Sequence, residues 1–200
     1  MARSLSYQPS NGKGAMHKIA LYGLPGAGKS TAARVLTEDL ASEGIKVARF
    51  RLAEPLYQAQ RVIYALADRP LADESQQDGR LLNMLGTEMR RINPAALTGP
   101  FVFRVRQAEK ENSHAVLLCD DLRAPDVETV INLGFRLVEI SAPAALRGAR
   151  RQARGDLATG DENHPTEAPL TVEPWRRIDN AGDLFEFRTR VGLLVKELRP

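Results

Sequence analysis

A glycine-rich stretch at residues 23–31 ends in lysine, serine and threonine. It reads Gly-Leu-Pro-Gly-Ala-Gly-Lys-Ser-Thr and fits the pattern G-x-x-x-x-G-K-S/T. Its glycines let the backbone wrap around an oligophosphate, so that successive N–H groups point at the anion. Lys29 would reach the β- and γ-phosphates, and the Ser30 hydroxyl would bind Mg²⁺. We expect this phosphate loop to hold a nucleotide through Gly23, Gly26, Ala27, Gly28, Lys29, Ser30 and Thr31.

The flanking residues supply the context that such a loop needs. Residues 19–22 form a short apolar run typical of a buried strand. After the loop, Ala33, Leu36 and Leu40 recur at helical spacing, and Gly44 stands where a helix would end. A chance glycine-rich turn is the alternative, and the order of strand, loop and helix favours phosphate binding. The loop alone does not distinguish a kinase from a GTPase or an ATPase.

Two acidic residues follow the clearest buried strand. Residues 115–119 are apolar and lead into Asp120 and Asp121, with Arg123 two positions later. A carboxylate at a strand end can order Mg²⁺ beside a phosphate loop, so Ser30, Asp120 and Asp121 are the candidate metal residues. Both aspartates could instead be plain turn residues. Arg123 could be a solvated loop cation, but it is placed to touch phosphate.

An arginine-rich segment at residues 144–154 is followed by a polar loop up to residue 167. Arginine suits the neutralisation of transferring phosphates because its charge is permanent and its donors are forked. Gly148, Gly155 and Gly160 offer hinges. We therefore favour a lid at 144–167, although the arginines could simply form a solvated helix face. The four arginines are Arg147, Arg150, Arg151 and Arg154.

The remaining hydrophobic pattern alternates between strands and helices. This alternation predicts a parallel sheet covered by helices on both faces, with ligands at the carboxyl ends of the strands. The phosphate loop and the two aspartates would then share one crevice. Further strands are expected near 45–50, 135–140 and 176–180, and further helices near 55–66, 82–92, 101–111, 125–133 and 184–198.

The composition of the chain limits the classes of protein to which it can belong. The chain has 200 residues, of which 43% are hydrophobic and 26% charged, as in an ordinary single globular domain. A net charge of +3 gives no strong case for nucleic-acid binding. No apolar run approaches the roughly 20 residues that span a membrane. Residues 1–16 have no apolar core of a secretory signal, and we expect a disordered extension. The single cysteine, Cys119, favours a reducing, cytoplasmic compartment.

Six short stretches between residues 18 and 198 form a further pattern. They are 23–31, 52–56 (Leu-Ala-Glu-Pro-Leu), 82–91 (Leu-Asn-Met-Leu-Gly-Thr-Glu-Met-Arg-Arg), 120–123 (Asp-Asp-Leu-Arg), 164–167 (His-Pro-Thr-Glu) and 178–182 (Ile-Asp-Asn-Ala-Gly). In content and order they resemble segments of the deoxynucleoside monophosphate kinases of bacteriophages and their bacterial relatives. These enzymes are a branch of the nucleoside monophosphate kinase family. The shared order of the stretches carries the resemblance more than any one of them.

The resemblance implies a P-loop kinase fold, a three-layer α/β sandwich with a mostly parallel five-stranded sheet. Residues 17–200 would form one such domain, with a monophosphate-binding region at about 52–112 and the lid at about 144–167. The implied reaction transfers the γ-phosphate of ATP, with Mg²⁺, to a (deoxy)nucleoside monophosphate.

The resemblance also implies roles for individual residues. Phosphoryl transfer needs two anions brought into line and their repulsion neutralised, which cations can supply. The implied catalytic residues are Lys29, Arg91, Arg123, Arg147 and Arg151. The implied acceptor-binding residues are Arg51, Tyr57, Glu88, Arg91 and Glu167.

The chain departs from the family pattern at two positions. Tyr57 stands where the family commonly has lysine, and Leu52 replaces an aromatic residue. Tyr57 would be either a core aromatic or a platform for an acceptor base, so the base preference stays open.

Two other functions also stay open, as does a homodimer. One is a kinase for a non-nucleotide phosphate, because animal-type phosphomevalonate kinases share much of the pattern. The other is a non-catalytic NTP-dependent switch, although the chain lacks N-K-x-D and D-x-x-G motifs.

Overall fold

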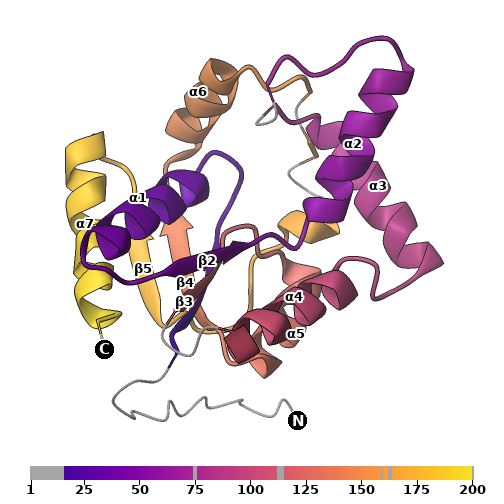
Figure 1. The fold of residues 1–200 in the computed structure, drawn as a ribbon. Helices are drawn as coiled ribbons and strands as arrows, with labels where there is room; N and C mark the ends of the chain where they lie inside the picture. Colours follow the sequence, from indigo (N-terminus) through magenta and orange to yellow (C-terminus); the bar gives the residue numbers. More distant parts are fainter. Residues whose placement is uncertain (1–15, 74–75, 112–114, 159, 162–163, 200) are drawn as a thin grey trace.

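A computed structural model describes residues 16–73, 76–111, 115–158, 160–161 and 164–199. The disordered extension expected at 1–16 falls outside these residues, apart from Met16. The described chain forms one sheet of five parallel strands in the order β2-β3-β1-β4-β5 (Figure 1). The strands are β1 (Lys18–Tyr22), β2 (Val47–Phe50), β3 (Val116–Cys119), β4 (Arg136–Ser141) and β5 (Arg176–Asp179).

Alternation along the central strand explains the layers. In β1, Ile19 and Leu21 face one hydrophobic core, while Ala20 and Tyr22 face the other. Because successive side chains of a strand point to opposite faces, a strand that is apolar throughout must be covered on both sides. The helices α1 (Lys29–Ser42) and α7 (Leu184–Glu197) pack together on the first face.

The second face is covered by α4 (Thr98–Glu111) and α5 (Val127–Asn132). Phe101 of α4 is fully buried there, where its ring meets those of Phe50 and Phe135. The result is the predicted three-layer α/β arrangement, with every strand pairing parallel. Cys119 is a buried core residue, as expected.

The remaining helices follow the carboxyl ends of the strands. α2 (Glu54–Leu66) comes after β2 and is joined through a polar loop to α3 (Gly79–Ile92), and α6 (Ala144–Arg154) comes after β4. A short 3₁₀ turn, η2 (Pro165–Glu167), ends the segment after α6. In Figure 1, α6 and the α2–α3 pair stand on opposite sides of the same end of the sheet. The phosphate loop and the acidic strand end therefore open between them.

No helix among the described residues is long and apolar enough to cross a lipid bilayer.

Candidate functional site

The phosphate loop has a backbone that its glycines make possible. Gly23, Gly26 and Gly28 have φ angles of 137°, 80° and 111°, a region that residues with a Cβ rarely adopt. A Cβ on Gly26 would also collide with the backbone carbonyl of Arg147, at the start of α6. The positive φ angles and the close backbone contact both require glycine, so these motif residues determine the shape of the loop.

Lys29 folds back over this loop. Its Nζ donates to the carbonyl of Gly23 at 2.6 Å and to that of Leu24 at 3.3 Å. Burial, and then the positive charge of Arg123, lower the pKa of Lys29 to about 7. A phosphate group beside the ammonium would reverse this shift, because an opposite charge favours the protonated form. Lys29 is thus placed to gain an anion as its partner.

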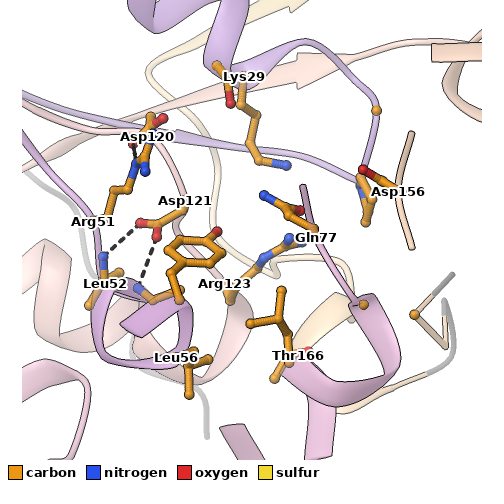
Figure 2. Close-up of a pocket in the computed structure, with 18 of the residues that line it drawn as sticks. Lys29, Arg51, Leu52, Leu56, Gln77, Asp120, Asp121, Arg123, Asp156 and Thr166 are labelled. Carbon is orange, nitrogen blue, oxygen red and sulfur yellow. Dashed lines mark hydrogen bonds and ion pairs between the residues drawn. The ribbon is translucent and has the colours of Figure 1, made fainter. Parts of the chain in front are cut away.

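The two aspartates at the end of β3 have different hydrogen-bond partners. Asp121 accepts the N–H groups of Leu52 at 2.8 Å and Ala53 at 2.9 Å, one on each oxygen (Figure 2). It therefore fixes the turn that starts α2. Burial and the neighbouring charge of Asp120 raise the pKa of Asp121 to about 6.

Asp120 uses only one of its two carboxylate oxygens for hydrogen bonds to the described residues. Its Oδ2 accepts from Arg49, while its Oδ1 is buried without a hydrogen bond among the described residues. Arg51 Nε lies 3.8 Å from that oxygen. Ser30 is exposed in the first turn of α1 and lines the same cavity as Asp120. A carboxylate and a hydroxyl are the hard oxygen ligands that Mg²⁺ takes, so Asp120 and Ser30 fit this ion.

One cavity of about 1000 Å³ joins these parts. It runs from the phosphate loop past Asp120, Asp121 and Arg123 to the inner faces of α2 and α3, with the lid segment (residues 144–167) along one side. Figure 2 shows Lys29, Asp121 and Arg123 around the same space. The predicted site residues that line it are Gly26, Gly28, Lys29, Ser30, Thr31, Arg51, Tyr57, Asp120, Asp121, Arg123, Arg151 and Glu167.

The α2–α3 end of the cavity differs from expectation on α3. Arg91 has a side chain that is 68% exposed, pairs with Glu88 at 2.7 Å and does not line the cavity, and neither does Glu88. Arg90 lines it instead, and its Nη2 donates to the buried carboxylate of Asp126 at 2.8 Å. Successive helix residues point about 100° apart, so a shift of one position moves a side chain off the inner face. The expected acceptor contacts of Arg91 and Glu88 do not fit their positions.

The lid arginines also divide differently from expectation. Arg147 is only 7% exposed, and its Nη1 lies 3.4 Å from the carbonyl of Pro25, which it approaches from behind the phosphate loop. It lines a second cavity of about 330 Å³, together with Gly23 and Ala27. Arg150, which the sequence placed among the lid arginines but not among the catalytic residues, lines the main cavity beside Arg151 and Arg154. The first turn of α6 packs on the loop, and this contact decides which arginines face the cavity.

Other predicted residues meet inside the main cavity. The guanidinium of Arg51 lies 5.7 Å from the centre of the Tyr57 ring. Arg123 donates to Glu167, which links the end of β3 to the lid segment. Tyr57 is half-buried and lines the cavity, so it is available as an aromatic surface.

The lid segment contacts the start of α3. The N–H of Gly79 donates to the carbonyl of Ala158 at 2.9 Å, and the N–H of Leu157 donates to the carbonyl of Gln77 at 3.0 Å. A Cβ on Gly79 would collide with the backbone of Gly160. These contacts cover the α2–α3 end of the cavity, and no residue pattern in the sequence pointed to them.

Asn83 of α3 is a further cavity residue that the sequence did not single out. Its Nδ2 is buried without a hydrogen bond among the described residues, and the side chain lines the cavity. Its place within the resembling stretch 82–91 gave no reason to choose it over its neighbours.

No protein-family model and no curated protein matches this chain. Solved structures do resemble it. TT1252 from Thermus thermophilus superposes with a TM-score of 0.54 at 21% identity, over 93% of this chain and 100% of that chain. The Mycobacterium tuberculosis APS kinase CysC, in complex with AMPPNP and APS, gives a TM-score of 0.49 at 16% identity, over 91% of this chain and 98% of that chain. At such identity the likeness to TT1252 shows the fold alone.

Proposed function

We propose that this protein transfers the γ-phosphoryl group of Mg·ATP to a (deoxy)nucleoside 5′-monophosphate, which yields the diphosphate and ADP. One observation carries the proposal: the cavity that begins at the phosphate loop continues to α2 and α3. Its volume of about 1000 Å³ is at the upper end of the range for single small-molecule sites. Donor and acceptor can therefore share one enclosed space.

The donor end binds the triphosphate. The loop amides and Lys29 would hold its phosphates, with the pKa of Lys29 restored by their charge. Mg²⁺ held by Ser30 and Asp120 would neutralise the charge of the β- and γ-phosphates. Asp121 has its oxygens turned to Leu52 and Ala53, so we assign it to positioning rather than to the metal.

The acceptor end carries the groups that a nucleoside monophosphate needs. Arg90 and Arg51 would bind its phosphate, with Arg90 held in place by Asp126. The Tyr57 ring offers a stacking surface for a base, and the Asn83 amide offers a hydrogen-bond donor. An aromatic surface beside an amide favours a nucleotide over a small aliphatic phosphate such as phosphomevalonate.

Transfer itself needs alignment and charge rather than a base. The attacking oxygen of a monophosphate is already ionised, so no proton must be removed to create the nucleophile. Arg123 lies between the two ends of the cavity, and Arg151 faces it from the lid segment. We assign to both the stabilisation of charge on the transferring group.

The lid contacts support a closed state during transfer. Gly79 and Leu157 join the lid segment to the acceptor helix by two backbone hydrogen bonds. A closed lid would exclude water, which otherwise competes with the acceptor for the phosphoryl group. Substrate-dependent protection of 144–167 from proteolysis would test this closure, and unchanged cleavage would count against it.

The test of the reaction is ADP release from Mg·ATP. The acceptor panel contains all common ribo- and deoxyribonucleoside monophosphates, together with phosphomevalonate. We expect turnover with one or a few nucleotides, which would also identify base and sugar. Turnover with phosphomevalonate alone would establish the non-nucleotide kinase. ATP binding with no turnover on any acceptor would favour a non-catalytic switch.

A further inference from the structure

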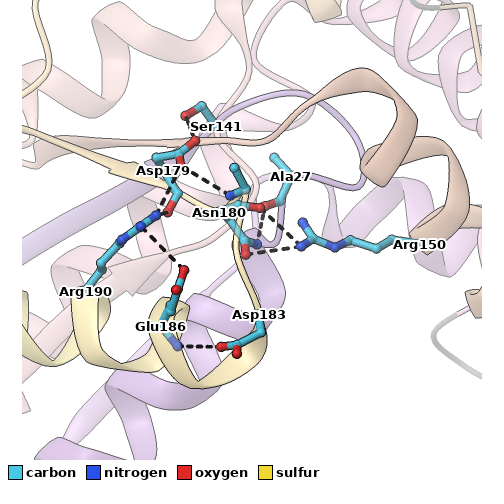
Figure 3. Close-up of polar contacts among 9 residues, drawn as sticks. Ala27, Ser141, Arg150, Asp179, Asn180, Asp183, Glu186 and Arg190 are labelled. Atoms are coloured by element: carbon cyan, nitrogen blue, oxygen red, sulfur yellow. Dashed lines mark hydrogen bonds and ion pairs between the residues drawn. The ribbon is translucent and has the colours of Figure 1, made fainter.

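Asn180 connects the end of the sheet to the phosphate loop. It follows β5 directly and is 4% exposed. Its side-chain Nδ2 donates to the carbonyl of Ala27 at 2.8 Å (Figure 3). Its own N–H donates to the carbonyl of Ser141, at the end of β4, at 2.7 Å. The side chain is thus anchored on two neighbouring strands before it reaches the loop.

The contact has a consequence for the next peptide group. A trans peptide is planar, so its carbonyl and the following N–H point in opposite directions. While the Ala27 carbonyl points at Asn180, the N–H of Gly28 must point away from it. Gly28 lines the main cavity, and a Cβ there would collide with Asn180 Nδ2. The loop peptide is therefore pressed against Asn180 on one side and faces the cavity on the other.

Asn180 also holds an arginine of the lid segment. Arg150 Nη2 donates to the Asn180 backbone carbonyl at 3.2 Å and to Oδ1 at 3.2 Å. Arg150 Nη1 is buried without a hydrogen bond among the described residues, and the side chain lines the main cavity. One asparagine thus uses its amide donor on the loop and its acceptors on the lid.

We propose that Asn180 is a positioning residue for the donor triphosphate. It turns the Gly28 amide toward the phosphates and holds the Arg150 guanidinium at the same end of the cavity, without touching the substrate itself. Donors fixed in advance bind an anion without the cost of reorienting. The inference rests only on the ATP half of the proposed function and needs no particular acceptor.

The decisive variant is Asn180→Asp. It keeps the size and the acceptors for Arg150, but it puts a carboxylate oxygen where the Nδ2 donor faced the Ala27 carbonyl. Repulsion would turn that peptide and misdirect the Gly28 amide. We expect the Kd for ATP, and for inorganic tripolyphosphate used as a probe, to rise about 10- to 30-fold by calorimetry, as befits a hydrogen bond to a charged group. The KM of the acceptor should change less than about twofold.

Two comparison variants separate the contacts. Asp179→Asn alters the preceding residue, whose exposed carboxylate pairs with Arg190, and should leave ATP affinity unchanged. Arg150→Ala removes the lid contact and the guanidinium itself but keeps the Asn180–Ala27 hydrogen bond, and it should weaken ATP binding less than Asn180→Asp does. An equal loss in Asp179→Asn would overturn the proposal, because the effect would then come from the strand end in general.

A purely structural role makes a different prediction. It would lower the melting temperature of Asn180→Asp but leave the tripolyphosphate affinity within about twofold, and that result would overturn the proposal. If the variant does not fold, the wild type gives the answer by NMR. Tripolyphosphate should shift the Gly28 amide resonance strongly, and an unmoved Gly28 signal would also overturn the inference.

The outcomes also separate this inference from the proposed function. Tight ATP binding by the wild type without turnover on any acceptor would remove the kinase assignment, and the Asn180 effect on affinity would still stand. Failure of the wild type to bind either ATP or tripolyphosphate would overturn both.

Discussion

The two ends of the main cavity are built in different ways. The donor end is built mainly on one contiguous stretch, residues 23–31, and Asp120 and Arg150 line the cavity with it. The acceptor end is assembled from side chains of α2, α3 and the lid segment, which are separated by tens of residues in the chain. A site formed by backbone N–H groups can be encoded by a short sequence motif. A site made of side chains on helices depends on how those helices are rotated and packed.

The charges differ in the same way. At the donor end Lys29 donates to two backbone carbonyl oxygens, and its pKa is lowered. At the acceptor end Arg90 already has the carboxylate of Asp126, whose pKa is raised chiefly by burial. The lysine at the donor end is therefore the cation whose pKa a bound phosphate would raise. The acceptor end holds its cation in place before any ligand binds.

Asp121 joins the two ends. It follows β3, which pairs with the strand before the phosphate loop, and its two oxygens accept the N–H groups of Leu52 and Ala53. A change at either end could reach the other through this carboxylate, so the variants below are measured against both substrates.

The largest effect is expected at the donor end, for Lys29→Ala. Loss of this cation should lower kcat about 10²- to 10³-fold, because it removes charge stabilisation of the transferring phosphate. Steady-state ADP release measures it. Lys110→Ala, which removes an exposed lysine of α4, is the matched control and should leave turnover unchanged. Normal activity in Lys29→Ala would remove the phosphate loop from the mechanism.

The next effect contrasts two adjacent arginines at the acceptor end. Removing Arg90 should raise the acceptor KM about 10- to 100-fold, the worth of a hydrogen bond to a charged group, with little change in the KM of ATP. Arg91→Ala should change either constant less than about twofold, because its side chain faces solvent.

Arg90 must be removed together with its partner. Arg90→Ala alone would leave the buried Asp126 carboxylate without a counter-ion, which is strongly destabilising. The double variant Arg90→Ala with Asp126→Asn avoids that loss, and its melting temperature checks the fold. A larger acceptor effect in Arg91→Ala than in the double variant would restore the original sequence prediction.

A pH series sharpens the electrostatic contrast. Lys29 in the free protein has a pKa of about 7 instead of 10.5, so it loses its charge above that pH. Bound phosphates require the charge, and ATP affinity should therefore fall roughly 5-fold between about pH 7 and pH 8, because the charged fraction of a group with a pKa of about 7 falls from about one half to about one tenth. Lys29→Arg stays charged and should show a flat profile over this range. Calorimetric Kd values for ATP decide between a slope and its absence.

The smallest effect tests the roof of the acceptor end. Gly79→Ala adds a Cβ that collides with the backbone of Gly160, while the first turn of α3 accepts alanine readily. We expect kcat/KM for the acceptor to fall about 5- to 10-fold, at the low end of overpacking costs, with ATP affinity unchanged. Gly192→Ala, where a Cβ meets open space in α7, is the matched control. Equal behaviour of the two variants would mean that the lid contact is not needed for transfer.

Much of the fold follows from local sequence. The apolar run of β1 and the helical spacing of α1 predicted both elements, and the alternation of strands and helices predicted a parallel sheet with two covered faces. Gly-rich loops and hydrophobic periods act over a few residues, so one sequence is enough to read them. The expected strand near 176–180 and the final helix were found for the same reason.

The different contacts of neighbouring residues within a short cluster could not be predicted from local sequence. Asp120 and Asp121 are adjacent, and only the turn after β2 decides that Asp121 accepts two backbone N–H groups while Asp120 Oδ1 stays without a hydrogen bond among the described residues. Arg147 and Arg150 are three positions apart, and the packing of α6 on Gly26 decides that one lies behind the loop and the other in the cavity.

The sequence by itself determined the phosphate-loop motif, the order of the strands and helices along the chain, and the end of the sheet at which the loop and the two aspartates lie, because each is a matter of residue type and short spacing. The tertiary structure alone decided that Arg90 rather than Arg91 lines the main cavity and that Asn180 reaches Ala27, 153 positions away. Both depend on helix rotation and on contacts between distant segments. A helix turns about 100° per residue, so neighbours in sequence become opposites in space once the helix is packed.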